Sequence, residues 1–194
     1  MRYDADAGLD VPTWHDQAEQ RVKLLAEFGL GEPDGEFDRF AAQISGAFAA
    51  ELGDHAQNLY AMVNLFLREE QTFVGLHNPP GMRAVDRTMA PDHGFCPEMI
   101  DRTKALVLAD VCAKPQFASN PVVDRLGVRT YAGAPLIHRP TGTVLGSVCV
   151  VGTRALPNDT RQTSLDLIKR HRDALADLLA TGGGGRHSAG YRSG

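Results

Sequence analysis

The stretch that decides the fold reads RTYAGAPLI at residues 129–137 and continues through Pro140-Thr141-Gly142 into TVLGSVCVV at residues 143–151. Both runs are apolar and bounded by turn residues, so they predict two antiparallel strands joined in a hairpin. Ala132, Gly133 and Ala134 are small residues where strands usually carry branched or aromatic ones. A neighbouring group must therefore approach this strand closely, and that group is either a ligand or a covering part of the protein itself.

Apolar periodicity predicts the elements on both sides of this hairpin. Two amphipathic helices ending near Gly29 and Gly53 come first, followed by strands at 58–67 and 72–76 and a third strand at 105–111. Short helices are expected after Cys96 and within 117–126, and a long helix capped by Asn158 or Asp159 closes the chain. This order describes an α+β domain with helices on one side of an antiparallel sheet.

Composition limits the classes of partner and compartment. The chain has 194 residues, a formal net charge of -4 and a pI of about 5.9, which favours neither nucleic acid nor an anionic membrane surface. No apolar run reaches the roughly 20 residues of a membrane helix, and the first ten residues lack the pattern of a signal peptide. We therefore expect a cytoplasmic protein that contacts neither nucleic acid nor membrane.

The cysteines and histidines do not form metal or disulfide patterns. Cys96, Cys112 and Cys149 are odd in number and widely spaced, which favours reduced thiols. The seven histidines have no compact ligand spacing, so no metal site is expected. Neither a GxSxG elbow nor a phosphate-binding loop is present, so we assign no catalytic residue and favour a role other than catalysis.

Several short motifs, in their order and spacing, carry a family resemblance: Gly94-Phe95-Cys96, Leu108-Ala109-Asp110, Phe117-Ala118-Ser119-Asn120-Pro121, Tyr131-Ala132-Gly133-Ala134-Pro135-Leu136 and Leu145-Gly146-Ser147-Val148-Cys149-Val150. With them the chain resembles the GAF domain family, in the subgroup whose pattern is roughly "fC", "D", "F..np", "YaGaPL" and "lGsLcv". The resemblance covers about residues 20–180. Residues 1–19 are then an N-terminal extension that holds at most the start of the first helix, and 181–194 a disordered glycine-rich tail.

The resemblance implies a fold and a class of function. The fold is a central antiparallel sheet of five or six strands, with the N- and C-terminal helices on one face and a pocket covered by loops and short helices on the other. The function is sensing of a small molecule or interaction with a protein. A signalling protein partner would receive the output in trans, and the first and last helices would pair in a homodimer. The sequence leaves the ligand and any cofactor unknown.

Eight residues are the candidates for ligand binding: Phe95, Cys96, Asp110, Phe117, Tyr131, Ala132, Gly133 and Cys149. Two of them are also suited to purely structural roles. Asp110 ends a strand and could equally well cap the following turn. Cys149 lies on one face of the last strand, together with Leu145 and Ser147, where it would simply fill the core.

Cys96 supports an alternative function. A thiol at a helix N-terminus can become reactive, which would make the protein a thiol-based redox sensor or a GAF-type reductase centred on Cys96. The branch of GAF domains that reduces methionine sulfoxide has its own cysteine pattern, which Cys96, Cys112 and Cys149 do not reproduce. A buried thiol that only fills space is the structural alternative. In a third interpretation the pocket is filled by the protein's own side chains.

Overall fold

The computed structural model describes residues 2–4, 9–11 and 16–182, and its centre is a six-stranded antiparallel sheet. The strand order is β5-β4-β3-β8-β7-β6, with the bounds β3 Tyr60–Phe66, β4 Gln71–His77, β5 Thr88–Met89, β6 Leu106–Leu108, β7 Thr130–His138 and β8 Thr143–Gly152. Two further strands, β1 Arg2–Asp4 and β2 Leu9–Val11, pair with each other in a separate ribbon. The predicted sheet and its two hairpins, β3–β4 and β7–β8, are confirmed.

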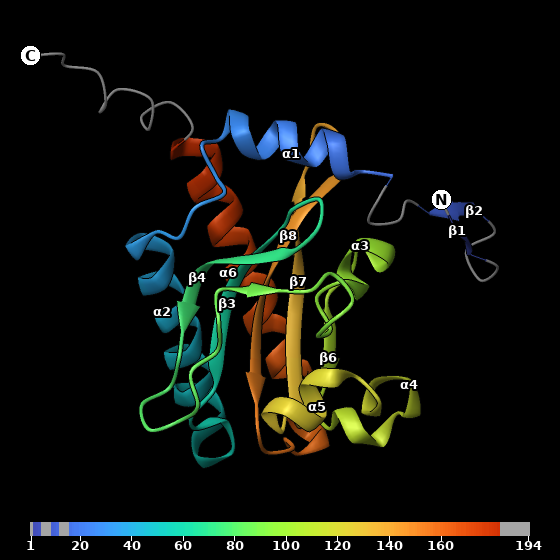
Figure 1. Ribbon diagram of the computed structural model, residues 1–194. Coiled ribbons are helices and arrows are strands. Elements are labelled where there is room, and N and C mark those ends of the chain that lie inside the picture. The colour runs from blue at the N-terminus through green and yellow to red at the C-terminus, as the bar shows by residue number, and fades with distance from the viewer. Residues whose placement is uncertain (1, 5–8, 12–15, 183–194) are drawn as a thin grey trace, which may run out of the picture.

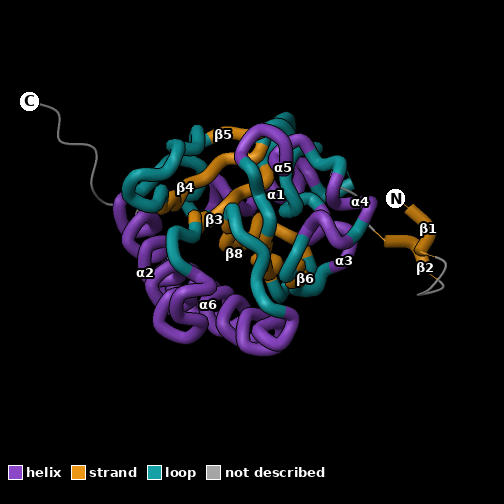
Figure 2. The backbone as a smooth tube through the Cα atoms, turned by 90° about the horizontal axis from the view of Figure 1, so that it is seen from below, coloured by secondary structure: helices purple, strands orange, loops and turns teal. Residues whose placement is uncertain are grey.

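Long helices cover one face of this sheet and one of its ends, and short helices cover the other face, as the views in Figures 1 and 2 show. The long helices are α1 Ala18–Glu27, α2 Gly35–Leu52 and α6 Arg161–Gly182, and the short ones are α3 Glu98–Arg102, α4 Pro115–Ala118 and α5 Pro121–Leu126. Three 3-10 turns, Gly53–Ala56, Val111–Ala113 and Asn158–Thr160, precede or join them. Helices α2 and α6 pack on one face, α1 packs against β8, and α3 to α5 lie on the opposite face. Among the described residues, none of the helices has the length and apolarity to cross a membrane.

Two hydrophobic cores result, one on each face of the sheet. The helix-side core contains Ala132 and Ala134 of β7 together with residues of α1, α2 and α6. The core on the other face contains Tyr131 of β7, Cys149 of β8 and the segment that leads into α3. Because both faces are covered, β3, β7 and β8 are apolar along nearly their whole length instead of alternating with polar residues.

The first helix differs from the sequence prediction in which side chains it buries. The helical spacing of Ala18, Val22, Leu25 and Phe28 predicts one apolar face, but Val22 is 40% exposed, whereas Arg21 is fully buried. The guanidinium Nε of Arg21 donates a 2.6 Å hydrogen bond to the carbonyl of Val144, and its charged group lies 5.9 Å from the centre of the Phe66 ring. The helix is capped by Gln17 without a side-chain bond. Thr13 and Asp16 resemble a capping box in the sequence, but Thr13 lies outside the described residues.

A bulge in the β7–β8 hairpin corrects a second expectation. The register shifts between Leu136 and Ile137, so Leu145 has no direct partner opposite it. One extra residue turns the side chains that follow to the opposite face. Leu145 therefore lies in the helix-side core, although simple alternation had placed it with Cys149.

The proposed boundaries at residues 19 and 180 remain predictions. α1 begins at Ala18, close to the first of them, and α6 ends at Gly182, close to the second. The tail that was expected to be disordered lies, from residue 183 onward, outside the described residues.

Candidate functional site

Five of the eight candidate residues meet in the core on the face opposite α2 and α6; they are Phe95, Cys96, Phe117, Tyr131 and Cys149. The Phe95 ring lies 5.3 Å from the ring of Tyr131 and 5.8 Å from that of Phe117, measured between centroids. All five side chains are buried. Residues from the segment before α3, from α4, from β7 and from β8 thus form one continuous site.

The segment that carries Cys96 is held in place by Asn120. The backbone N–H of Gly94 donates to Asn120 Oδ1 at 3.0 Å, and Asn120 Nδ2 donates to the Gly94 carbonyl at 2.7 Å. Asn120 Oδ1 also accepts from Val122 N, which caps helix α5. The "np" pair of the sequence motif therefore ties the cover of the site to the start of α5.

Two thiols and a phenol are in contact at the centre of the site. The Sγ atoms of Cys96 and Cys149 lie 3.6 Å apart, and the Tyr131 hydroxyl donates to Cys96 Sγ at 3.5 Å. Cys149 Sγ also lies 3.7 Å from the Met62 sulfur. Both cysteines are reduced, and they are 6% and 1% exposed, respectively. Only a molecule small enough to enter the core could reach them.

These contacts shift the pKa values of the two thiols in opposite directions. The pKa of Cys96 is lowered to about 6, because the Cys149 thiol and then the Ser147, Tyr131 and Asn64 side chains favour its thiolate, while burial opposes this. The pKa of Cys149 is raised well above its usual value by the same contact with Cys96 and by burial. The pKa of Tyr131 is also raised, mainly by burial. The site therefore combines one acidic thiol with a neighbouring protonated one.

The floor of the site contains polar residues that the motifs did not predict as functional. Asn64 and Ser147 face each other across β3 and β8, and Asn64 Nδ2 donates to Gln71 Oε1 at 2.8 Å. Asn64 Oδ1 and Ser147 Oγ are buried and have no hydrogen-bond partner among the described residues. Thr72 Oγ1 is also unpartnered there, but Thr72 lies opposite Leu65 and faces the helix-side core. Asn64 had one sequence signal, since it is the polar exception in an otherwise apolar strand.

The small residues of β7 have close neighbours within the protein. A Cβ atom at Gly133 would clash with the phenol of Tyr131, so the Tyr131 ring lies along the strand over this glycine. Ala132 points to the opposite face, into the core formed with α6. Gly133 thus belongs to the floor of the site, whereas Ala132 does not contact it.

Asp110 lies apart from the thiol pair. Its carboxylate accepts from Arg129 Nη2 at 2.8 Å and Nε at 3.2 Å, and from Cys112 N at 3.0 Å. The pKa of Asp110 is lowered, chiefly by the hydrogen bond from Arg129. These contacts are those of a turn cap and an ion pair, which was the structural alternative for this residue.

The empty space at the site is small. A cavity of about 30 Å³ is lined by residues that include Met62, Phe95, Cys96, Tyr131 and Cys149. This is room for one or two water-sized molecules, whereas sites for metabolites usually occupy roughly 300 to 1,000 Å³. No group of three or more metal-ligating side chains occurs among the described residues.

Comparison with known proteins settles the family. The family model of the GAF domain matches residues 41–171. This chain belongs to the GAF domain family. No curated protein sequence matches the chain.

Solved structures share the fold of this GAF domain at low sequence identity. A putative GAF sensor protein from Burkholderia vietnamiensis is 20% identical, with a TM-score of 0.51, over 87% of this chain and 96% of that one. The GAF domain of a phosphoenolpyruvate-protein phosphotransferase from Acinetobacter is 14% identical, with a TM-score of 0.55, over 91% and 98%. A free methionine-R-sulfoxide reductase from Neisseria meningitidis, in complex with its substrate, is also 14% identical, with a TM-score of 0.55, over 94% of each chain. At such identities these structures show the fold alone.

Family membership supports a signalling or ligand-binding role for this GAF domain. The sequence motifs that contain Cys96, Tyr131 and Cys149 come together in this core. They did not predict the pairing of Cys96 with Cys149, because 53 residues separate the two cysteines in sequence.

Proposed function

We propose that this GAF domain is a signalling module that senses a small oxidant at the Cys96–Cys149 thiol pair and acts in trans on a partner protein in the cytoplasm. The 3.6 Å contact between the two sulfur atoms carries the proposal. A thiol of low pKa beside a second thiol is the usual arrangement of redox-sensing cysteines. The cavity of about 30 Å³ would admit hydrogen peroxide more readily than a metabolite.

The chemistry needs only the two cysteines and hydrogen peroxide. The Cys96 thiolate attacks one peroxide oxygen, so an S–O bond forms, the O–O bond breaks, and the departing hydroxide takes a proton to become water. Cys149 sulfur then attacks the sulfur of the resulting sulfenic acid. An S–S bond forms, the S–O bond breaks, and hydroxide leaves as water with the proton of Cys149. Two thiols are oxidised to a disulfide and one peroxide is reduced to two waters; a dithiol reductant would restore the pair by exchange.

Peroxide titration with mass spectrometry tests this function. Stoichiometric hydrogen peroxide should remove two hydrogens from the intact mass and protect Cys96 and Cys149, but not Cys112, from alkylation after unfolding. In Cys149→Ser the product should instead carry one added oxygen on Cys96. Cys112→Ser is the matched control, because Cys112 is the exposed cysteine and should not be needed. Oxidation of Cys112 alone, with the pair still alkylatable, would contradict the proposal.

A second candidate is the sensing of a small ligand in the same site. It is favoured by the unpartnered polar atoms of Asn64 and Ser147, which an entering polar molecule would satisfy. Such a ligand would have to displace the Phe95–Cys96 segment, since the cavity is too small. Native mass spectrometry of protein purified from its own host should then show a retained molecule. Empty protein whose melting temperature no metabolite changes would leave only the role of an interaction module.

The output would pass through the first and last helices. Val22 on α1 and Leu178 on α6 are large hydrophobic residues that are 40% and 52% exposed, respectively. We propose that they contribute to a homodimer or a partner interface. Leu178→Glu should convert a dimer to monomer in light scattering, whereas Gln162→Glu, at an exposed position on the opposite side of the same helix, should not. A wild-type protein that is monomeric at high concentration would exclude the homodimer.

A further inference from the structure

A second pocket lies on the opposite side of the sheet from the thiol pair, where the end of β7 meets the C-terminal part of α6. It has a volume of about 340 Å³, roughly ten times that of the cavity beside Cys96. This volume lies within the range of small-molecule sites. The sequence motifs reach this region only through Leu136 and Leu145, and none of the eight candidate ligand-binding residues lines it.

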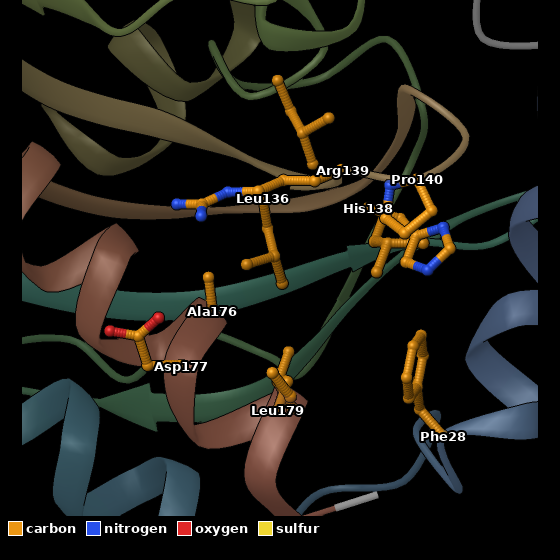
Figure 3. A pocket seen from close by; sticks show the side chains of 11 residues that line it. Phe28, Leu136, His138, Arg139, Pro140, Ala176, Asp177 and Leu179 are labelled. Carbon is orange, nitrogen blue, oxygen red and sulfur yellow. The ribbon is translucent and has the colours of Figure 1, made fainter.

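Apolar side chains form most of the wall. They come from the C-cap residue of α1 and from β7, β8 and α6, and the largest are Phe28, Leu136, Ile137, Leu145 and Leu179. Figure 3 shows Phe28 and His138 on one side of the pocket and Ala176 and Leu179 on another. His138 is held in place, because its Nδ1 bonds to Thr141 Oγ1 at 2.8 Å and its ring makes an edge contact with Phe28 at 5.6 Å. The pocket is therefore shaped before any ligand enters.

The charged groups of the lining are Arg139 and Asp177. Arg139 is exposed and makes no hydrogen bond or ion pair with the described residues, and in Figure 3 its side chain extends along the pocket toward Ala176. Asp177, in contrast, has an interaction of its own within the protein. A guanidinium is well suited to bind a carboxylate through two parallel hydrogen bonds.

We propose that this pocket binds a small amphipathic carboxylate, with its apolar body against Leu136, Leu145 and Leu179 and its carboxylate on Arg139. Because α6 supplies one wall, the bound molecule would contact the helix that we propose for output. The site is separate from the thiol pair, so the inference does not depend on the redox function.

Octanoate is the probe, with octanol and octylammonium as the neutral and cationic analogues. Calorimetric titration of the full chain should give the tightest binding for octanoate. Arg139→Gln should weaken the affinity for octanoate by about fivefold, which is the contribution expected of a partly exposed ion pair. The affinity for octanol should not change. Arg154→Gln, at another exposed arginine that does not line the pocket, is the matched control and should change neither. Asp177→Asn should increase the affinity for octanoate, since the substitution removes a negative charge near the bound carboxylate.

A steric variant tests the location. Ala176 lines the pocket and Ala174 is an exposed alanine on the same helix outside it, so Ala176→Phe should abolish octanoate binding while Ala174→Phe preserves it. Absence of octanoate binding at millimolar concentration would overturn the proposal. So would equal binding of all three probes, or binding that survives both Arg139→Gln and Ala176→Phe. If the protein binds octanoate but its thiol pair does not respond to peroxide, the proposed carboxylate site stands and only the redox function is rejected.

Discussion

The hydroxyl of Tyr131 lies over Gly133, in the space that a side chain at residue 133 would fill. From this position the same hydroxyl donates to Cys96 Sγ at 3.5 Å. The glycine in the middle of β7 therefore allows the phenol to lie against the strand and reach the thiol. The Tyr131 hydroxyl thus connects Gly133 with the acidic thiol of Cys96.

Gly133→Ala should destabilise the domain, because the new methyl group would force the Tyr131 ring away from the strand. Overpacking of this kind costs about 1–3 kcal/mol of unfolding free energy. Urea denaturation measures it. Gly46→Ala is the control, since Gly46 is exposed in helix α2 with no atom near its would-be Cβ, and it should stabilise the protein by up to about 1 kcal/mol. Equal effects of the two substitutions would mean that Tyr131 is not held by Gly133.

Ionisation of Cys96 should make stability depend on pH. The pKa of Cys96 in the folded state is about 6, and the ordinary value is 9.0. As pH rises, the folded state therefore loses the Cys96 proton at a lower pH than the unfolded state. A lowered pKa contributes stability that is fully present above the ordinary pKa and is lost as pH falls through the folded one. The unfolding free energy of the wild type, relative to Cys96→Ser, should therefore rise between pH 6 and pH 9.

The control for this titration is Cys112→Ser, which removes an exposed thiol. Tyr131→Phe should reduce the pH-dependent gain, because it removes one donor to Cys96. A difference between wild type and Cys96→Ser that stays flat from pH 6 to pH 9 would show that Cys96 keeps its proton in the folded state.

Asp110→Asn distinguishes a structural role from a ligand-binding one. The substitution weakens the bonds to Arg129 and to Cys112 N, and both partners of the ion pair are partly exposed. Asparagine keeps an oxygen that can cap Cys112 N, and screening by solvent limits the ion pair to at most about 1 kcal/mol. Stability should therefore fall by no more than about 1 kcal/mol, measured in urea, while peroxide reactivity of Cys96 stays unchanged. Asp86→Asn, at an exposed position without a described partner, should have no effect on either.

The pKa of Asp110 adds a pH signature to this prediction. Because Arg129 lowers it below the ordinary value of 3.8, the carboxylate contributes stability above that value and loses it as pH falls further. The stability difference between wild type and Asp110→Asn should therefore shrink below about pH 4. A large change in Cys96 reactivity in Asp110→Asn would instead connect Asp110 to the site.

Arg21→Met should destabilise the attachment of α1 to the sheet. The arginine is fully buried and donates to the Val144 carbonyl, and burial lowers its pKa to about 10. Loss of a buried charged donor costs about 1.5–3 kcal/mol. Lys23→Met, at an exposed position on the same helix, is the matched control and should cost less than about 0.5 kcal/mol. Denaturation curves that coincide for the two variants would show that Arg21 contributes nothing.

The sequence by itself determined the order of elements, the antiparallel hairpins and the family. These follow from local periodicity, from turn residues such as Pro140-Thr141-Gly142, and from motifs whose residues are close together in the chain. It also indicated that something must lie close to residues 132–134. It could not say what, because the neighbour of Gly133 depends on the rotamer of Tyr131.

Only the tertiary structure decided the features that join distant segments. Cys96 meets Cys149 because the segment before α3 folds over β8, and Arg21 is buried because α1 packs against the start of that strand. The β-bulge in β8, where Leu145 has no partner between Leu136 and Ile137, placed Leu145 in the opposite core, against its alternation in sequence. Contacts of this kind depend on packing among elements far apart in the chain, for which local periodicity contains no information.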